Sequence, residues 1–324
     1  GSDGEKSYTK VGNFKQNPWP ATHVVGKDII RFHAIYWPIL LMAAGIELPH
    51  QVVVHSHWLS DGFKMSKSLG NVVDPQKVAS YYGTDPFRFF VMEYSTLETD
   101  CNYQEDAFYY TRENIVSKYA NLATRCGGGN FNIERAVSAF KAGKFDNIGE
   151  VIANSSLNSE IESIEKSRKQ LIDRANNTSE AMNSYFERFD QLKAINEWWQ
   201  LCESGNEMFQ LGQPWVYAKT SKEDTEHELL MDYYTFSALE VCRISSILIQ
   251  PIMPELSLKI LDRLGVDPAS RTLERAKFGA DLNYGHGANR KGHSLPIVRI
   301  PQMGKVEEKE KEKKGNKEKK QKKK

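Results

Sequence analysis

The pattern of hydrophobic and polar positions changes character near residue 100. Before it, two short segments rich in β-branched residues, 22–26 (THVVG) and 51–57 (QVVVHSH), lie on either side of a long apolar stretch, 27–45. The length and composition of the stretch favour a helix, which we expect to kink at Pro38 and end at Gly45. Strand, helix and strand in this order predict a βαβ unit with parallel strands and a right-handed crossover. The β-branched run in 51–57 predicts a strand in the middle of a sheet.

Helical periodicity takes over after residue 100, and strand signals become rare. Residues 103–129 form one long amphipathic stretch that ends in three glycines. Further helical patterns cover 157–186, 188–211 and 226–250, and a last helix runs to Gly265. A short final strand is expected at 294–301 (SLPIVRIP).

These patterns predict an α/β portion followed by an all-α helical bundle. We place the first domain at residues 1–100, the helical domain at 101–302, and a disordered tail at 303–324. The boundary itself is expected between residues 97 and 103.

Two Asp-Pro pairs, Asp74-Pro75 and Asp85-Pro86, follow the second strand. An aspartate can cap a helix N-terminus, and proline suits the first helical position because its missing N–H is not needed there. Each pair therefore predicts a helix that begins at its proline.

Charge is unevenly distributed along the 324 residues. Residues 303–324 hold eleven lysines and five glutamates, a formal charge of +6, which leaves −5 for residues 1–302. The tail has too few apolar residues to fold. Two interpretations remain open for it, a salt-sensitive tether to RNA or a membrane surface and a simple solubilising tail.

Composition also excludes some classes of protein. No segment approaches the roughly 18 uncharged apolar residues that span a bilayer, and the N-terminus carries no secretory signal. The four cysteines form no CxxC pair, so we expect neither a disulfide framework nor a zinc site. His55 and His57 face the same way on a strand, but no third metal ligand lies near them in sequence.

The richest chemistry lies in residues 61–71, DGFKMSKSLGN, which follow the second strand. Ligands of open parallel sheets bind at the carboxyl ends of the strands. Lys64 and Lys67 are compact charges suited to phosphate oxygens, and Ser66 and Ser68 add hydroxyl donors. If a reaction expelled pyrophosphate, cations here would stabilise the charge that develops on the leaving group.

The pentapeptide KMSKS at 64–68 resembles the signature of class I aminoacyl-tRNA synthetases. Together with GKDIIRFHAIYWP, VVHSHW, KMSKSLGNVVDP, NLATRC and PWVYAK, it resembles the methionyl-tRNA synthetase family of the bacterial and mitochondrial type. The resemblance covers residues 20–300. The combination of motifs disfavours the leucyl, valyl and cysteinyl relatives.

The resemblance implies roles for single residues. In addition to the catalytic lysines Lys64 and Lys67, it implies an ATP site formed by Gly26, Asp28, His55, Lys64, Ser66, Lys67 and Ser68, and a methionine site formed by Ile29, Phe32 and His33. From the residues alone, Asp28 is equally a helix cap, and Ile29 with His33 is an ordinary core face.

For the helical domain, the resemblance implies that Asn121, Arg125 and Trp215 read the anticodon of tRNA(Met). Asn can form a bidentate contact with a base edge, Arg donates in a planar fork, and Trp offers a stacking surface. Without the resemblance, Asn121 and Arg125 would be an i, i+4 pair on a helix surface and Trp215 a buried loop residue.

The sequence also departs from the family, because none of its eight histidines forms the HxGH signature. We therefore expect the C-terminal portion of a methionine–tRNA ligase that uses ATP and Mg²⁺, with methionine and tRNA(Met) as partners. The alternative is a non-catalytic RNA-binding module. The resemblance further implies a mitochondrial protein whose presequence lies outside this sequence, with a cytoplasmic one as the alternative.

Overall fold

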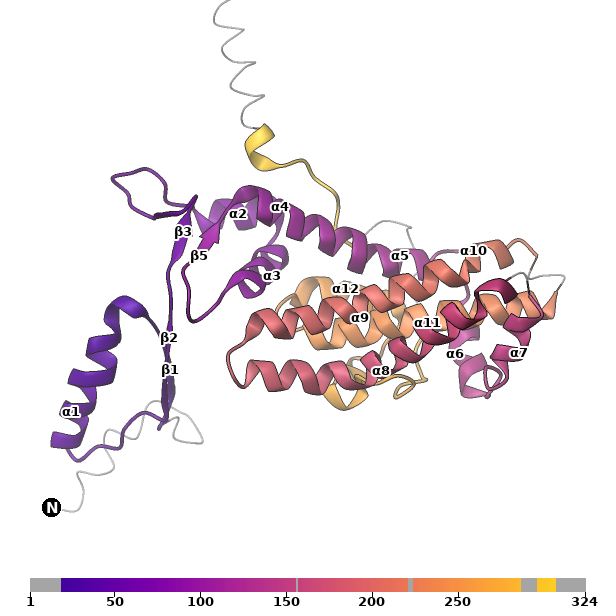
Figure 1. Ribbon diagram of the computed structural model, residues 1–324, viewed down its shortest axis with the longest axis horizontal. Helices are drawn as coiled ribbons and strands as arrows, with labels where there is room; N and C mark the ends of the chain where they lie inside the picture. The colour runs from indigo at the N-terminus through magenta and orange to yellow at the C-terminus, as the bar shows by residue number, and fades with distance from the viewer. Residues whose placement is uncertain (1–18, 156, 221–223, 287–295, 307–324) are drawn as a thin grey trace, which may run out of the picture. The chain divides into compact units, whose positions relative to one another are not determined.

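The structure is a computed structural model that describes residues 19–155, 157–220, 224–286 and 296–306 (Figure 1). The chain divides into two compact units, and each is described by itself. The first comprises Gly1–Val72 and Ser95–Tyr103, and the second comprises Val73–Tyr94 and Gln104–Lys324. Residues 73–94, which the sequence analysis assigned to the first domain, pack with the helices of the second unit.

The predicted βαβ unit is present in the first unit. Strand β1 (Thr22–Gly26) pairs in parallel with β2 (Gln51–His55), and Gly26 lies opposite His55 at their carboxyl ends. The chain between the two strands is helical, as predicted.

The prediction that the second strand is buried in the middle of a sheet is wrong for the described residues. There β2 has a single partner, β1, and of its residues only Val53 is buried. A buried parallel strand needs neighbours on both edges and layers on both faces, and the described residues supply one neighbour.

The apolar helix between the strands is irregular. It begins as a 3₁₀ turn, η2 (Lys27–Ile29), widens into a π-helix, η3 (Phe32–Tyr36), and ends as α1 (Trp37–Ala43). Gly45 follows with φ 67°, so the predicted stop is confirmed. Pro38 lies in the first turn of α1, and because its ring excludes a regular i→i−4 turn, the wide π turn directly before it accommodates the proline.

A second, three-stranded sheet has the order β4-β3-β5. Strand β3 (Trp58–Ser60) pairs antiparallel with β4 (Phe63–Lys64) and parallel with β5 (Cys101–Tyr103). Asp61 and Gly62 connect β3 to β4 with φ of 49° and 82°, which is the type I′ hairpin geometry that Asp-Gly favours. The lysine-bearing segment therefore begins as a hairpin, which the sequence analysis did not foresee.

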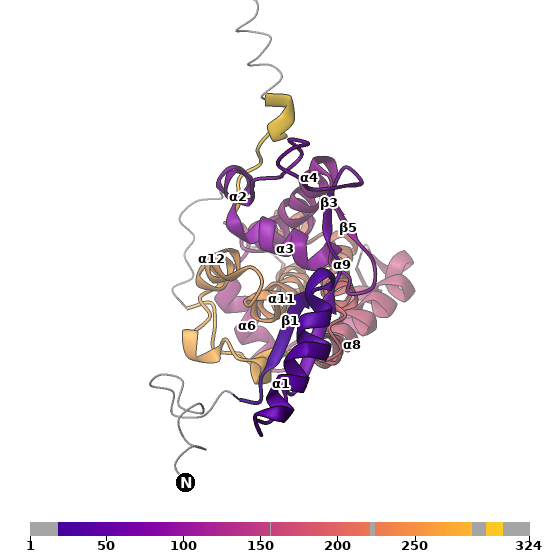
Figure 2. The same ribbon diagram turned by 90° about the vertical axis from the view of Figure 1, so that its left-hand side faces the viewer.

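The second unit is a helical bundle built around α11 (Thr225–Ile249). This helix is buried on all sides from Leu230 to Ile249, and α9 (Gln191–Gly212), α6 (Ile133–Lys141) and α12 (Pro254–Leu264) pack against it (Figure 2). Helix α8 (Ile161–Phe186) lies beside α9 (Figure 1). The remaining helices are α2 (Pro75–Tyr82), α3 (Thr84–Tyr94), α4 (Glu105–Asn114), the π-helix η4 (Ile115–Ala120), α5 (Asn121–Cys126), α7 (Ile148–Ala153) and α10 (Pro214–Tyr217), with short 3₁₀ turns at Asn158–Glu160, Pro268–Ser270 and Leu273–Arg275.

One of the two predicted helix caps is correct and the other is wrong. The Asp74 carboxylate accepts from the N–H groups of Gln76 and Lys77 at the start of α2. Helix α3, however, begins at Thr84, so Asp85 is inside its first turn. Gly83, at φ 100°, reverses the chain and starts the helix earlier than Asp85-Pro86 predicts.

The final strand predicted at 294–301 is also absent from residues 296–301, the part that the structure describes, because these residues have no strand partner. Side chains satisfy this backbone instead: Arg112 donates to the carbonyl of Val298, and Tyr81 donates to that of Pro301. The prolines at 296 and 301 have no N–H to offer a neighbouring strand. The predicted disorder of the tail is wrong for residues 303–306, which are helical, and the N–H of Met303 donates to the hydroxyl of Tyr82. The rest of the predicted tail, residues 307–324, lies outside the described residues.

Within the described ranges, no helix is both long and apolar enough to cross a membrane. The four cysteines are buried free thiols.

Candidate functional site

The carboxyl ends of β1 and β2 meet in a tight polar corner. A Cβ added at Gly26 would lie 2.8 Å from Oδ1 of Asp28 and 3.9 Å from Cε1 of His55. Glycine is therefore the residue that fits where the Asp28 and His55 side chains approach the first strand. The structure thus brings together Gly26, Asp28 and His55, which the sequence analysis assigned to one site.

The Asp28 carboxylate is exposed and keeps its charge. Oδ1 of Asp28 lies 3.5 Å from Nε2 of His57. The hydrogen bond from His57 lowers the pKa of Asp28 below its ordinary value, and the positive charge of Lys64 lowers it further. An ionised, exposed carboxylate near Lys64 can accept hydrogen bonds from a ligand's hydroxyl groups.

His57 and Asp100 support this corner, and sequence reasoning missed both roles. Oδ1 of Asp100 accepts from the backbone N–H of His57 at 2.9 Å and from Nζ of Lys27 at 2.6 Å. The bond from Lys27 lowers the pKa of Asp100. Asp100 is far from His57 in sequence, and no local pattern marks it.

Lys64 and Lys67 are exposed at the start and in the middle of the KMSKS segment. Neither ammonium pairs with a carboxylate in the described part of the chain. Oγ of Ser66 lies 2.7 Å from Oγ of Ser68, so these hydroxyls share a hydrogen bond. The segment therefore offers two exposed cations, of which Lys64 acts electrostatically on the Asp28 carboxylate at the strand ends. Clustered ammonium groups of this kind suit a polyphosphate.

Residues 29–37 present a partly exposed apolar surface. Nδ1 of His33 lies 3.1 Å from the carbonyl of Ile29, and the ring of His33 contacts that of Trp37 edge to face at 5.9 Å. Ile29 is 38% and Phe32 60% exposed in the described chain. These exposures do not fit a packed core face, and Phe32 contacts Tyr36 rather than His33.

Arg125 and Trp215 lie against each other in the second unit, although 90 positions separate them. The guanidinium carbon of Arg125 is 4.9 Å from the ring centre of Phe209 and 5.4 Å from that of Trp215. Nη2 of Arg125 also donates to Oε1 of Gln210 at 3.3 Å. Partial burial lowers the pKa of Arg125, and the flanking rings compensate through cation–π contacts. Asn121 lies one turn before Arg125 on α5, at the i, i+4 spacing that places both residues on one side of the helix.

The turn after α9 positions Trp215. A Cβ at Gly212 would overlap the ring of Tyr234, so α9 ends in close contact with α11. Gln213 then adopts a left-handed conformation, φ 41°, and Pro214 begins α10. This sharp reversal brings Trp215 back onto Arg125 and Phe209.

The predicted methionine site and the predicted anticodon site each lie at a π-helix, which the sequence did not predict. The turn η3 contains Phe32 and His33, and η4 ends with the N–H of Asn121 donating to the carbonyl of Val116. π turns are frequent at functional sites because the wider turn changes the direction of the side chains that follow.

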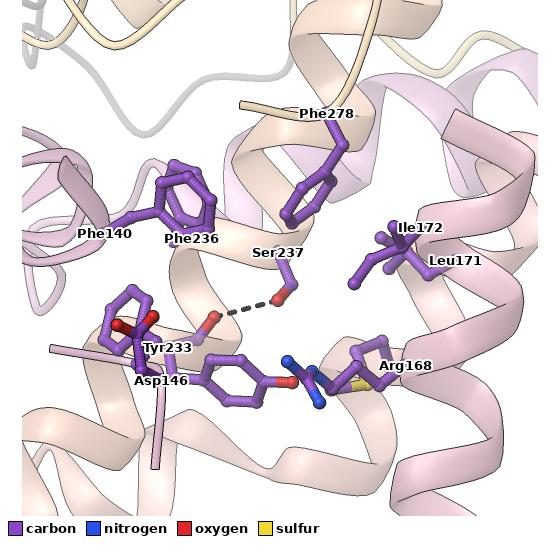
Figure 3. A pocket seen from close by; sticks show the side chains of 11 residues that line it. Phe140, Asp146, Arg168, Leu171, Ile172, Tyr233, Phe236, Ser237 and Phe278 are labelled. Carbon is purple, nitrogen blue, oxygen red and sulfur yellow. Dashed lines mark hydrogen bonds between the residues drawn. The ribbon is translucent and has the colours of Figure 1, made fainter. Parts of the chain in front are cut away.

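A cavity in the helical unit is a poor candidate for the nucleotide site. It has a volume of about 60 Å³, and Figure 3 shows Phe140, Phe236 and Phe278 on one side and Tyr233 near Arg168 on the other. An apolar cavity that holds benzene measures about 150 Å³, so a nucleobase does not fit. In the described residues, no three His, Cys, Asp or Glu side chains gather as a metal site.

Comparison with known proteins gives two family matches. Residues 3–127 match the model of class I tRNA synthetases (M), and residues 160–296 match the anticodon-binding domain of methionyl-tRNA ligase. The two matches fall on the α/β portion with the start of the helices and on the bundle.

Individual proteins agree with these matches. The chain is 50% identical over 290 residues to the mitochondrial methionine–tRNA ligase of Candida albicans, covering 87% of this chain and 50% of the relative. It is 42% identical to the mitochondrial enzyme of Saccharomyces cerevisiae, covering 86% and 46%. The structure of Mycobacterium tuberculosis methionyl-tRNA synthetase in complex with methionyl-adenylate superposes with a TM-score of 0.67 at 30% identity, over 87% of this chain and 51% of the other. The chain thus spans about half the length of these relatives.

Proposed function

Because the chain belongs to the methionyl-tRNA synthetase family, we propose that it supplies the phosphate-binding segment and the anticodon-binding bundle of a methionine–tRNA ligase. The observation that carries this proposal is that Lys64 and Lys67 are both exposed on one short segment, and that the charge of Lys64 lowers the pKa of the Asp28 carboxylate at the strand ends. The relatives whose names describe methionine–tRNA ligases support the reaction.

The chemistry requires positioning and charge rather than a protein nucleophile. The carboxylate of methionine attacks the α-phosphate of ATP, a bond forms between them, and pyrophosphate leaves. Lys64 and Lys67 stabilise the charge that develops on the leaving group, and the Ser66 and Ser68 hydroxyls add donors. Mg²⁺ bound with ATP would supply Lewis-acid stabilisation of the phosphate charge, while Lys64 and Lys67 would hold the phosphates.

The corner at the strand ends would receive the rest of the nucleotide. Asp28 accepts from the ribose hydroxyls, Gly26 leaves room for the sugar, and His55 contacts the adenine. Ile29, Phe32 and His33 form the methionine site, where apolar and aromatic groups suit a thioether.

In the bundle, Asn121, Arg125 and Trp215 bind the anticodon of tRNA(Met). The Arg125 guanidinium already lies over the Trp215 ring, so an unpaired base can add to an existing pair of side chains. Asn121 supplies a carboxamide for a base edge.

A second function deserves a test because the sequence contains no HxGH pattern. A chain that binds RNA without catalysis would keep the anticodon platform and lack adenylate formation. Two assays on the same preparation of the full-length protein separate these functions: ATP–pyrophosphate exchange dependent on methionine, and filter binding of initiator and elongator tRNA(Met). Exchange above background supports the ligase, whereas tRNA binding without exchange supports the binding module. Absence of both contradicts the whole proposal.

We also propose a mitochondrial location, supported by the names of the fungal relatives. The test is fractionation of cells that express the tagged full-length protein. Recovery in the mitochondrial matrix supports the proposal, and recovery in the cytosol contradicts it.

A further inference from the structure

The backbone of the KMSKS segment is held by one side chain outside the motif. Oδ1 of Asn71 accepts from the N–H of Ser66 at 2.8 Å, and Nδ2 of Asn71 donates to the carbonyl of Lys64 at 3.2 Å. These two bonds fix the backbone on both sides of Met65. The Asn71 carboxamide thus accepts one backbone hydrogen bond and donates another, as a peptide group of a neighbouring strand does.

Two backbone hydrogen bonds also hold the turn that brings Asn71 back to Lys64. The N–H of Leu69 donates to the carbonyl of Ser66, and the N–H of Gly70 donates to that of Lys67, at 3.2 and 3.3 Å. Gly70 adopts φ 67°, a conformation that glycine enters without strain. The chain therefore closes on itself between Lys64 and Asn71.

We infer that Asn71 is a positioning residue that sets the distance and direction between the Lys64 and Lys67 ammonium groups. The inference rests on the proposed function, in which these cations contact the phosphates of ATP. Both lysines are long, flexible and exposed, so their only fixed reference is the backbone that carries them. Holding that backbone before ATP arrives removes part of the ordering cost from binding and from the transition state.

Proteolysis tests the geometry without reference to activity. The carbonyl of Lys64, to which Asn71 donates, belongs to the peptide bond that trypsin would cut after Lys64. We expect Asn71→Ala and Asn71→Leu to raise the rate of cleavage at Lys64–Met65 about tenfold, because each removes both hydrogen bonds. Asn71→Asp keeps an acceptor for Ser66 and loses the donor to Lys64, so its rate should be intermediate. Cleavage after Lys219, in the other unit, is the internal reference.

Asn102→Ala is the matched control. Oδ1 of Asn102 accepts from the N–H of Gly62 at 2.8 Å, so it is also an asparagine bound to the backbone of this hairpin. Within the described part of the chain, the Asn102 side chain forms no hydrogen bond with residues 64–70. Asn102→Ala should leave the Lys64 cleavage rate within about twofold of wild type, since its bond holds the turn at Gly62 rather than the lysine segment.

Kinetics of methionine-dependent pyrophosphate exchange test the consequence in the full-length protein. Asn71→Ala and Asn71→Leu should raise KM for ATP about three- to tenfold and lower kcat, with KM for methionine unchanged. Asn71→Asp, which keeps one bond, should recover part of the loss. A residue with a merely structural role would instead lower the active fraction and leave both KM values unchanged.

The outcomes are distinct. Cleavage and KM that both match wild type overturn the inference, and so does faster cleavage with unchanged KM and kcat. If the wild-type protein shows no exchange, the proposed function fails, while the cleavage rates still decide whether Asn71 holds the segment.

Discussion

The carboxylate of Asp85, in the first turn of α3, accepts a hydrogen bond from the backbone N–H of Leu256 at 2.7 Å. Leu256 is in the first turn of α12, where N–H groups have no partner within their own helix. Asp85 therefore caps a helix that begins about 170 residues later, rather than the helix whose start it was predicted to mark. Arg88, one turn further along α3, donates to the carbonyls of Pro251 and Ile252 just before α12.

Removing this cap should destabilise the bundle. We expect Asp85→Ala to lower the free energy of unfolding by about 1–3 kcal/mol, because it leaves a buried N–H without an acceptor. Urea denaturation followed by circular dichroism measures this loss. Asp74→Ala, which removes the exposed cap of α2, is the control and should cost less. An equal loss of unfolding free energy in both variants would show that burial of the hydrogen bond to Leu256 adds nothing to stability.

The same carboxyl group predicts a pH dependence. Burial raises the pKa of Asp85 above its ordinary value of 3.8, so the folded state binds this proton more tightly than the unfolded state does. The contribution of Asp85 to stability is thus full below pH 3.8 and declines as pH rises through the folded-state pKa. Asp85→Asn removes the titration and keeps an acceptor oxygen. The stability difference, wild type minus Asp85→Asn, should fall as the pH rises above 3.8, and a constant difference would contradict the raised pKa.

Gly26→Ala should impair the use of ATP and spare the fold. The new Cβ would lie 2.8 Å from Oδ1 of Asp28, and because that carboxylate is 62% exposed it can move away at little cost in stability. We expect KM for ATP to rise about threefold or more with an unchanged melting temperature. If the effect acts through Asp28, Gly26→Ala adds nothing in an Asp28→Ala background. If the two substitutions instead raise KM for ATP additively, the effect of Gly26→Ala does not act through Asp28.

Lys67→Ala should slow adenylate formation more than it weakens methionine binding. The lost cation stabilises charge on the departing pyrophosphate, so kcat for pyrophosphate exchange should fall about tenfold or more while KM for methionine stays near wild type. Lys169→Ala, an exposed lysine of α8, is the control for loss of charge alone. An exchange rate equal to wild type would remove Lys67 from the reaction.

Trp215→Ala should weaken binding of tRNA(Met) about tenfold or more and leave adenylate formation unchanged. Stacking of one base on an aromatic ring contributes about 1–3 kcal/mol, and this substitution also removes the ring that packs on Arg125. Trp215→Phe keeps a stacking surface and should lose less. Val216→Ala, at the exposed neighbouring position, should bind as wild type does. Normal affinity of Trp215→Ala for the tRNA would exclude it from the RNA contact.

The sequence by itself determined the features that depend on local periodicity. The long helices α8, α9 and α11 follow from apolar residues repeated every three or four positions, and the parallel pairing of β1 with β2 follows from the helix between them. The KMSKS segment was identified by its residue order alone. Its hairpin also has a local signal, because Asp-Gly favours the type I′ turn that Asp61 and Gly62 form.

Tertiary structure decided every feature that joins residues distant in sequence. Asp85 has the composition of a local cap, but its partner depends on how α12 packs on α3. The contact of Arg125 with Trp215 depends on a left-handed turn at Gln213 and on the fit of Gly212 against Tyr234, and Asp100 reaches His57 through the pairing of β3 with β5. A hydrogen bond or ring contact between distant residues is fixed by the packing of whole elements, and no local sequence pattern contains that packing.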